Sequence, residues 1–197
     1  HGALAKITEA VLGALRVAEE ADVLTRNDTS PMTCSDPAGE LYNDHVGLKN
    51  LWCGVNSQEL QMVSPEMQEE FLLNYQIPCL QQYGAVQYGC CEDLTRKIDI
   101  VRAIPNLRIF VCSYWTDIDK LISSCGNEYT IMWRQLSAHI MLPDNLEDAK
   151  KNLEIGARKL QGLPYQIILR EVETLAGHPD RLKEWTDLAI AAAERFA

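Results

Sequence analysis

The sequence predicts an α/β fold of five strand–helix units preceded by a single helix. Short apolar runs alternate along the chain with longer amphipathic segments, a pattern typical of a parallel sheet whose strands are connected by helices. The runs "IFV" and "QIIL" are apolar at consecutive positions, as expected for strands that are covered on both faces. The 197 residues, 47% of them hydrophobic, suit one domain, and we expect residues 1–197 to form it.

Residues 1–48 are expected to form a leading helix and a long loop, ahead of the five units in residues 49–197. The helix is predicted over residues 2–24, where apolar side chains recur at helical spacing. Residues 25–48 are rich in Asn, Asp, Ser, Thr, Pro and Gly, which predicts an irregular loop. A loop of this length in a compact domain is usually either functional or disordered.

Each of the five units consists of an expected strand and the helix that follows it. The expected strands are the runs "LKNLWCGVN", "AVQYG", "LRIFVCS", "YTIMWR" and "YQIILR". The helices that follow them are expected over residues 65–83, 94–104, 116–124, 145–160 and 180–196. Ser64 and Pro65 predict the start of the first of these helices, with a cap and a proline at the first helical position. Pro78 predicts a bend in it, and Gly84 predicts its end.

Proline and glycine also mark the boundaries of the later helices. Pro105, Gly126 and Gly162 follow three of them, and Pro179 with Asp180 precedes the last. Five units fit an open sheet or an incomplete barrel, because a closed barrel of this type needs eight strands and typically about 250 residues. The chain has no GxGxxG and no GxxxxGK[ST], so neither nucleotide-binding fingerprint supports the open sheet.

The net charge and the cysteine content indicate which classes of partner the protein can bind and which cellular compartment suits it. The net charge of -10 disfavours nucleic acid and anionic membranes as partners, because both would repel the chain. No apolar run approaches the ~20 residues of a membrane span, and the first residues lack the layout of a secretory signal. Seven cysteines, an odd number and several of them in apolar runs, predict free thiols in a reducing, cytoplasmic compartment.

Three segments resemble the uroporphyrinogen decarboxylase-like superfamily: "NSQELQMVSPEMQEEFLLNYQIPCLQQYG", "YGCCEDLTRKIDIVRAIPNLRIFVCSYWTDIDKL" and "HPDRLKEWTDLAIAAAERF". The most specific piece is the cysteine segment with the following "IPNLR". That superfamily folds as a (β/α)₈ barrel, and it includes porphyrinogen decarboxylases and zinc-dependent methyltransferases that use a methylated corrinoid protein. The resemblance implies a partial (β/α)₈ TIM barrel, the later part of one, without its first three strands.

The segment "GCCED" follows a predicted strand, where the chemistry of a parallel barrel takes place. The corrinoid-linked methyltransferases carry a His-x-Cys pair here and a further cysteine after the last strand, and these three ligands leave one zinc position open. Cys90 matches the cysteine of the pair, but Tyr88 stands at the histidine position and no cysteine follows the last strand. Carboxylates can also bind zinc, so the candidate ligands are Cys90, Cys91, Glu92, Glu171 and Glu173. The alternative is a pair of metal-free thiols.

Polar and aromatic residues at the expected strand ends predict a small-molecule pocket. Its candidate substrate-binding residues are Glu59, Tyr88, Tyr114, Trp115, Trp133 and Arg134. Arg134 can hold an acidic group through two hydrogen bonds. The resemblance implies a methyltransferase-type enzyme fragment that acts on a small molecule, and the alternative is a non-catalytic binding protein that has lost the metal site. Decarboxylation is not expected, because the chain lacks the arginine-rich and Gly-His-Gly segments of those enzymes.

The missing strands also predict assembly. An incomplete barrel would leave its apolar interior uncovered and two strand edges free, and free edges pair readily with other chains. The two edges would be the strands in "LWCGV" and "YQIILR". We expect the chain to pair with the missing first part of the barrel or with a second copy of itself. A corrinoid protein is a further partner that the resemblance implies.

Overall fold

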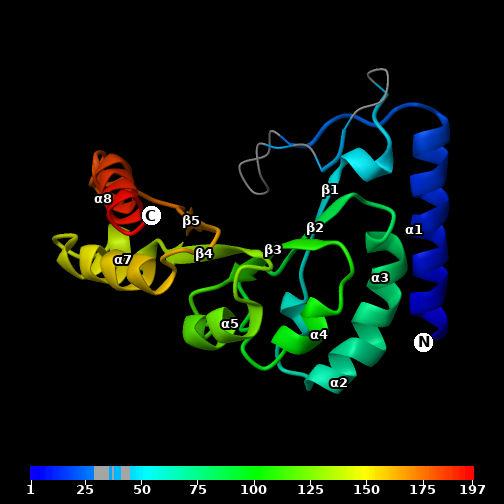
Figure 1. The fold of residues 1–197 in the computed structure, drawn as a ribbon, viewed down its shortest axis with the longest axis horizontal. Coiled ribbons are helices and arrows are strands. Elements are labelled where there is room, and N and C mark those ends of the chain that lie inside the picture. Colours follow the sequence, from blue (N-terminus) through cyan, green and yellow to red (C-terminus); the bar gives the residue numbers. More distant parts are fainter. Residues whose placement is uncertain (29–35, 37, 41–44) are drawn as a thin grey trace.

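The computed structural model describes residues 1–28, 36, 38–40 and 45–197, and Cys34 and part of the loop predicted over 25–48 lie outside the described residues. The described chain contains one sheet of five parallel strands (Figure 1). These are β1 (Trp52–Val55), β2 (Ala85–Tyr88), β3 (Leu107–Cys112), β4 (Thr130–Leu136) and β5 (Tyr165–Arg170). The strands follow the chain order β1-β2-β3-β4-β5, without the reversal of a doubly wound sheet. The predicted parallel α/β fold is confirmed.

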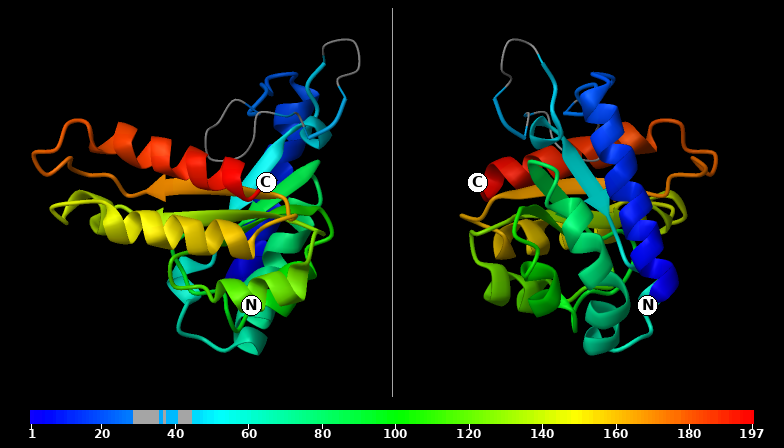
Figure 2. Two further views of the ribbon diagram at one scale, coloured as in Figure 1. Left: turned by 60° about the vertical axis from the view of Figure 1, so that its left-hand side comes forward. Right: turned by 90° about the vertical axis from the view of Figure 1, so that its right-hand side faces the viewer.

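One helix precedes the sheet, others connect its strands, and the last follows the final strand. They are α1 (Gly2–Glu20), α2 (Pro65–Gln68), α3 (Asn74–Leu80), α4 (Ile98–Arg102), α5 (Ile118–Cys125), α6 (Ala138–Met141), α7 (Glu147–Lys159) and α8 (Arg181–Arg195). Short turns of 3₁₀ helix, η1 (Leu48–Asn50) and η2 (Gln58–Leu60), flank β1. Helices α7 and α8 run beside β4 and β5, whereas α1 packs on α3 at the other end of the sheet (Figures 1 and 2).

The helix predicted over 65–83 is present but irregular. The side chain of Ser64 accepts the backbone N–H of Met67 at 3.2 Å, as predicted for the cap. A π-helical segment, η3 (Glu69–Leu73), separates α2 from α3. Pro78 lies inside α3, where it has no N–H to continue the helical hydrogen bonds.

Two other helices differ from the sequence-based prediction. The helix expected over 94–104 is reduced to α4, which begins at Ile98. The N–H of Leu94 donates to the hydroxyl of Thr116 at 3.1 Å. The following residues to Lys97 form a turn, and the Lys97 ammonium donates to the carbonyl of Leu60 at 2.7 Å. The sequence pattern also did not predict α6, a four-residue helix directly after β4.

The sheet has an apolar cluster on each face. On one face, strand residues such as Val86 and Phe110 pack against helix residues such as Leu121 and Leu153, and all four are fully buried. On the other face the cluster consists of Trp52, Ala85, Ile109, Val111 and Met132, with Ala38 and Ile168 packed against it. Its five members are at most 9% exposed. The expectation of an uncovered apolar interior is therefore wrong for this part of the sheet, which the segment around Ala38 helps to cover.

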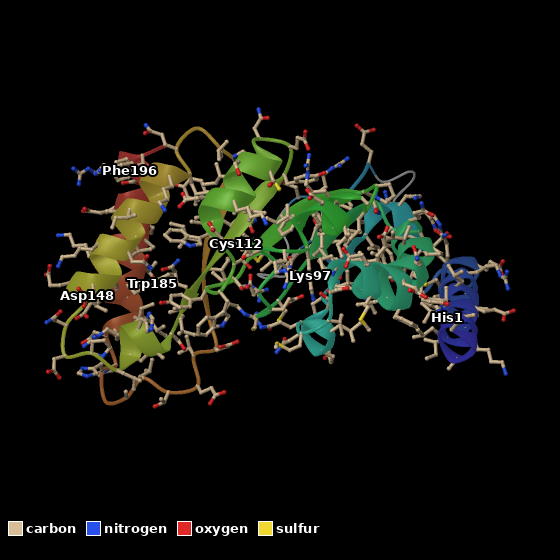
Figure 3. All side chains as sticks on the ribbon, turned by 90° about the horizontal axis from the view of Figure 1, so that it is seen from below. His1, Lys97, Cys112, Asp148, Trp185 and Phe196 are labelled. Atoms are coloured by element: carbon tan, nitrogen blue, oxygen red, sulfur yellow. The ribbon has the colours of Figure 1, made fainter. Side chains whose placement is uncertain are left out.

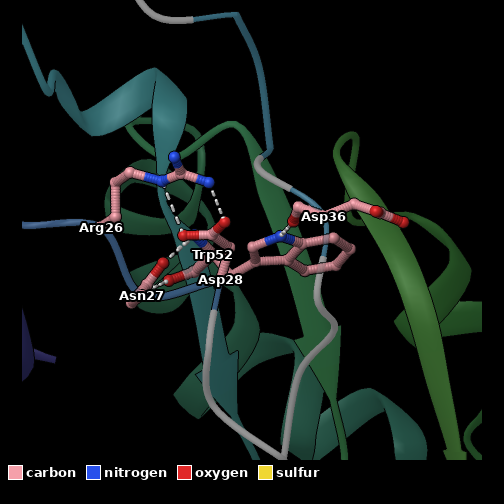
Figure 4. Close-up of polar contacts among 5 residues, drawn as sticks. All are labelled: Arg26, Asn27, Asp28, Asp36 and Trp52. Carbon is pink, nitrogen blue, oxygen red and sulfur yellow. Dashed lines mark hydrogen bonds and ion pairs between the residues drawn. The ribbon is translucent and has the colours of Figure 1, made fainter. Parts of the chain in front are cut away.

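The outer edge of β1 is occupied by the chain's own leading segment (Figure 4). The side-chain amide of Asn27 accepts the backbone N–H of Trp52 at 3.0 Å and donates to its carbonyl at 2.7 Å, as a neighbouring strand would. Asp28, only 3% exposed, pairs with the Arg26 guanidinium, and this hydrogen bond lowers the pKa of the Asp28 carboxyl. The indole N–H of Trp52 donates to the carbonyl of Asp36 at 2.9 Å. These contacts fix the segment against β1.

None of the described helices is both long enough and apolar enough to cross a membrane.

Candidate functional site

A small pocket lies at the carboxyl ends of the strands, where α/β proteins usually bind their ligands. Its cavity volume is about 30 Å³, room for one small group, within about 290 Å³ of space that includes open solvent. Each of four consecutive strands contributes to the wall. The lining residues are Cys90 and Cys91 after β2, Ser113, Tyr114 and Trp115 after β3, Arg134, Gln135 and Leu136 on β4, and Arg170 and Glu171 at the end of β5.

Arg134 is the residue of this pocket that most clearly points to a ligand. Its side chain is carried on β4 into a buried position, and the residue is only 3% exposed. Its Nε and Nη1 atoms have no hydrogen-bond partner among the described residues, and Nη2 has only the sulfur of Met132 at 3.9 Å. A buried guanidinium without a carboxylate partner is costly. An anionic ligand would supply the missing acceptors, and the planar guanidinium suits carboxylate and phosphate groups.

A pair of thiols forms another part of the wall. The sulfur atoms of Cys90 and Cys91 are 3.6 Å apart, and the Cys91 thiol donates to Oε1 of Glu171 at 2.7 Å. Burial, followed by the Glu171 hydrogen bond, raises the pKa of Cys91 to about 12. The Cys91 thiol is therefore protonated at neutral pH.

The position of Glu171 depends on a strained backbone. Its φ of 60° lies in the left-handed region, which non-glycine residues seldom adopt. The Ser137 hydroxyl donates to the carbonyl of Glu171 at 2.6 Å and thereby links this turn to the segment after β4. Strain of this kind is common at binding and catalytic sites.

Glu92 is a structural connector between the loops that surround the pocket. It is fully buried, and its Oε1 accepts the backbone N–H of Ser57 at 2.8 Å and the hydroxyl of the same residue at 3.3 Å. Its Oε2 accepts the backbone N–H of Cys90 at 2.7 Å. The carboxylate thus joins the loop after β1 to the loop after β2, while the Ser113 hydroxyl donates to its backbone carbonyl at 2.8 Å.

The predicted zinc ligands are only partly brought together. Cys90, Cys91 and Glu171 meet at the pocket, whereas the two oxygens of Glu92 accept hydrogen bonds from Ser57 and from the backbone N–H of Cys90, and Glu173 is exposed. Within the part of the chain that the structure describes, no group of three or more His, Cys, Asp or Glu side chains is arranged to hold a metal ion.

The predicted substrate-binding residues divide between two faces of the sheet. Arg134 and the aromatic pair Tyr114 and Trp115, which are 43% and 61% exposed, line the pocket. Tyr88 and Trp133 belong to the core on the helix-covered face, where the Tyr88 hydroxyl accepts from the Gln68 amide at 3.2 Å. Trp133 and Arg134 are consecutive, so they point to opposite faces of the strand.

One of the predicted residues lies outside the pocket, and one residue of the pocket was not predicted. Glu59 is exposed on η2, after β1, and is not part of the pocket wall. Arg170 lines the pocket but was not among the predicted residues. Its signal was its place as a charged residue directly after the apolar stretch "IIL" of the predicted strand, at the same edge of the sheet as Arg134.

Comparisons with known proteins found no matching family model, no similar curated protein and no similar solved structure. The family resemblance therefore depends on the sequence segments in which it was recognised.

Proposed function

We propose that this chain binds a small molecule through an anionic group, a carboxylate or a phosphate, at the carboxyl ends of β2 to β5. The single observation that carries this proposal is the buried guanidinium of Arg134, whose Nε and Nη1 lack partners among the described residues. Arg170 adds a second positive charge to the same wall. The exposed rings of Tyr114 and Trp115 would contact the remainder of the molecule, since they stand at the pocket rim.

The proposed architecture is the later part of a (β/α)₈ barrel. The consecutive order of five parallel strands supports it, because neighbouring strands of such a barrel follow chain order. The pocket position supports it as well, since these barrels bind their ligands at the carboxyl ends of the strands. The anion site is proposed independently of barrel closure.

Thermal unfolding with added anions tests the binding function. Inorganic phosphate, succinate and benzoate would be added at constant ionic strength to wild type, Arg134→Met and Arg108→Met. At least one anion should raise the melting temperature of wild type, because a ligand at 100 times its Kd stabilises the folded state by about 2.7 kcal/mol. Arg134→Met should lose this response and, without ligand, unfold no more easily than wild type, since it removes an unpaired buried charge.

The control removes the same charge outside the pocket. Arg108 is exposed at the start of β3, so Arg108→Met should respond to the anions as wild type does. An Arg134→Met chain that is stabilised as strongly as wild type would exclude Arg134 as the anion site. Equal loss of response in both variants would indicate a nonspecific effect of net charge.

Zinc-dependent methyl transfer, with a corrinoid protein as methyl donor, is the second candidate function. The observation that favours it is the meeting of Cys90, Cys91 and Glu171 at the pocket. These residues would have to rearrange before they could hold zinc, because no metal-binding group is present among the described residues. Elemental analysis of protein purified without chelator separates the two functions. Close to one equivalent of zinc supports methyl transfer, and its absence after zinc dialysis supports simple binding.

We also propose that the chain associates through the β5 edge, either with a second copy or with a separate first part of the barrel. The β1 edge is occupied by Asn27, whereas β5 pairs only with β4 among the described strands. Beside β5 lies an apolar groove that includes Tyr165, Ile167 and Trp185. The buried Trp185 indole N–H has no acceptor among the described residues.

The groove lies at the end of the molecule opposite His1, where Figure 3 shows Trp185 on α8 and Phe196 directly after it. A partner that covers this apolar surface would remove it from water, which favours association. Light scattering of the isolated chain should therefore give a mass that rises with concentration toward twice that of one chain. A mass of 22.2 kDa at every concentration would contradict association of the isolated chain with itself.

A further inference from the structure

We infer that Cys90 and Cys91 form a reversible redox site, at which oxidation to a disulfide between the two adjacent residues lowers the affinity of the neighbouring pocket for anions. This inference rests on the proposed binding function, because it assigns a regulation to the same pocket. The oxidant it requires is a peroxide. The thiol pair, the carboxylate of Glu171 and the guanidinium of Arg134 all line the one pocket.

The sulfur atoms are already in contact. They are 3.6 Å apart, and a disulfide needs about 2.05 Å. Adjacent Cα atoms are only about 3.8 Å apart, below the usual disulfide range of about 4.4–6.8 Å, so the bond would be strained and easily reduced. Both residues are half-buried and lie in bends, outside the strands and helices, so ring closure breaks no strand pairing. Gly89, with φ of 111°, precedes them and lets the chain turn there. Cys112 and Cys125, by contrast, are buried in the core.

The reaction balances with one peroxide. The Cys90 sulfur attacks a peroxide oxygen and becomes a sulfenic acid as one water is released. The Cys91 sulfur then displaces the hydroxyl group from Cys90, which forms the disulfide and releases a second water. Two S–H bonds are oxidised and one O–O bond is reduced. Cys90 attacks first because the Cys91 hydrogen is held in a hydrogen bond to Oε1 of Glu171 at 2.7 Å.

The loss of the Cys91 hydrogen has a direct consequence for the pocket. In the reduced chain this hydrogen is donated to Oε1 of Glu171 at 2.7 Å. The disulfide has no hydrogen to donate, so the Glu171 carboxylate loses this partner while two arginines line the same pocket. A carboxylate without its donor is attracted to the nearest guanidinium. Glu171 would then compete with an anionic ligand for Arg134 or Arg170.

The test compares the reduced and the peroxide-treated wild-type chain. Intact-mass measurement should show the loss of two hydrogens, and peptide mapping should place the disulfide between residues 90 and 91. Calorimetric titration with phosphate and benzoate should give at least about a tenfold weaker affinity for the oxidised chain. Dithiothreitol should restore the original mass and the original affinity together.

Three variants separate the steps. Cys90→Ser and Cys91→Ser should show no peroxide-induced disulfide, whereas Cys79→Ser, which changes a half-buried cysteine outside the pocket, should respond like wild type. Glu171→Gln should still form the disulfide, but its affinity should no longer fall on oxidation, because the neutral amide does not compete for arginine.

The outcomes distinguish this inference from the proposed function. A reduced chain that binds neither anion would overturn the binding function and the regulation with it. A reduced chain that binds, combined with an oxidised chain that lacks the 90–91 disulfide or binds equally well, would overturn the regulation alone.

Discussion

Replacement of Glu92 by glutamine should lower the free energy of unfolding by about 3 kcal/mol. The buried carboxylate accepts three hydrogen bonds, from the N–H and hydroxyl of Ser57 and from the N–H of Cys90. A glutamine side chain has one carbonyl oxygen and an NH₂ group, so its NH₂ would face an N–H donor that then lacks an acceptor. Urea unfolding in buffer that contains a metal chelator measures the change.

Glu59→Gln is the matched control for this change. Glu59 lies in the loop after β1, to which the Glu92 carboxylate is bound, but it is exposed, so its replacement should alter the free energy of unfolding by less than about 0.5 kcal/mol. A Glu92→Gln chain that is as stable as wild type but binds less zinc would identify Glu92 as a metal ligand instead of a connector of loops.

Replacement of Gly156 by alanine should destabilise the chain by about 2 kcal/mol. A Cβ atom at this buried position of α7 would lie 2.0 Å from Cη2 of the Trp133 ring and 2.3 Å from its Cζ2. Forcing a methyl group into a packed core costs about 3 kcal/mol. The gain in helix propensity from glycine to alanine returns about 1 kcal/mol of this. The Trp133 fluorescence should also change, because the ring must move.

Gly13→Ala provides a control with the opposite sign. Gly13 lies inside α1, and a Cβ atom there would meet nothing within 4 Å. This substitution should therefore stabilise the chain by about 0.5–1 kcal/mol through helix propensity alone. Equal shifts of both variants in urea unfolding would show that α7 does not pack on Trp133 as described.

The sequence predicted the order of strands and helices because the local signals are strong. Apolar runs give the strands, Ser64 caps α2, and Gly126 with φ of 52° follows α5 at its expected end. The shortening of the helix before Pro105 was not predictable in this way. The residues before α4 bond to other strand–helix units, Leu94 through its N–H to Thr116 and Lys97 through its ammonium to the carbonyl of Leu60, and such long-range contacts have no local sequence signal.

The sequence predicted a pocket at the strand ends, where the structure has one, but it predicted only some of the residues that line it. Residues at strand ends meet at one edge of a parallel sheet, and this placed Arg134 and the segment after β2 correctly near one another. The alternation of a strand shows that Trp133 and Arg134 face opposite sides, but not which side the helices cover. In the structure Trp133 lies in the core against Gly156, and Tyr88 belongs to the same core. Both were predicted to bind substrate because the sequence does not show which side of a strand is covered.

The thiol cluster depends on long-range contact. Glu171 reaches Cys91 across 80 positions of the chain, and its left-handed backbone is held by Ser137. Neither feature has a local sequence signal, since the segment after β5 contains several carboxylates. The structure selects Glu171 from among them and leaves Glu173 exposed.

Nuclear magnetic resonance of the arginine Nε–H groups tests the anion site most directly. The Arg134 signal would be identified in ¹⁵N-labelled protein by its absence from the spectrum of Arg134→Met. Titration of the reduced chain with phosphate or benzoate should shift this signal in a saturable way, while the signal of exposed Arg108 stays in place. An Arg134 signal that does not move while calorimetry shows the anion to bind would contradict the proposal that Arg134 holds the ligand.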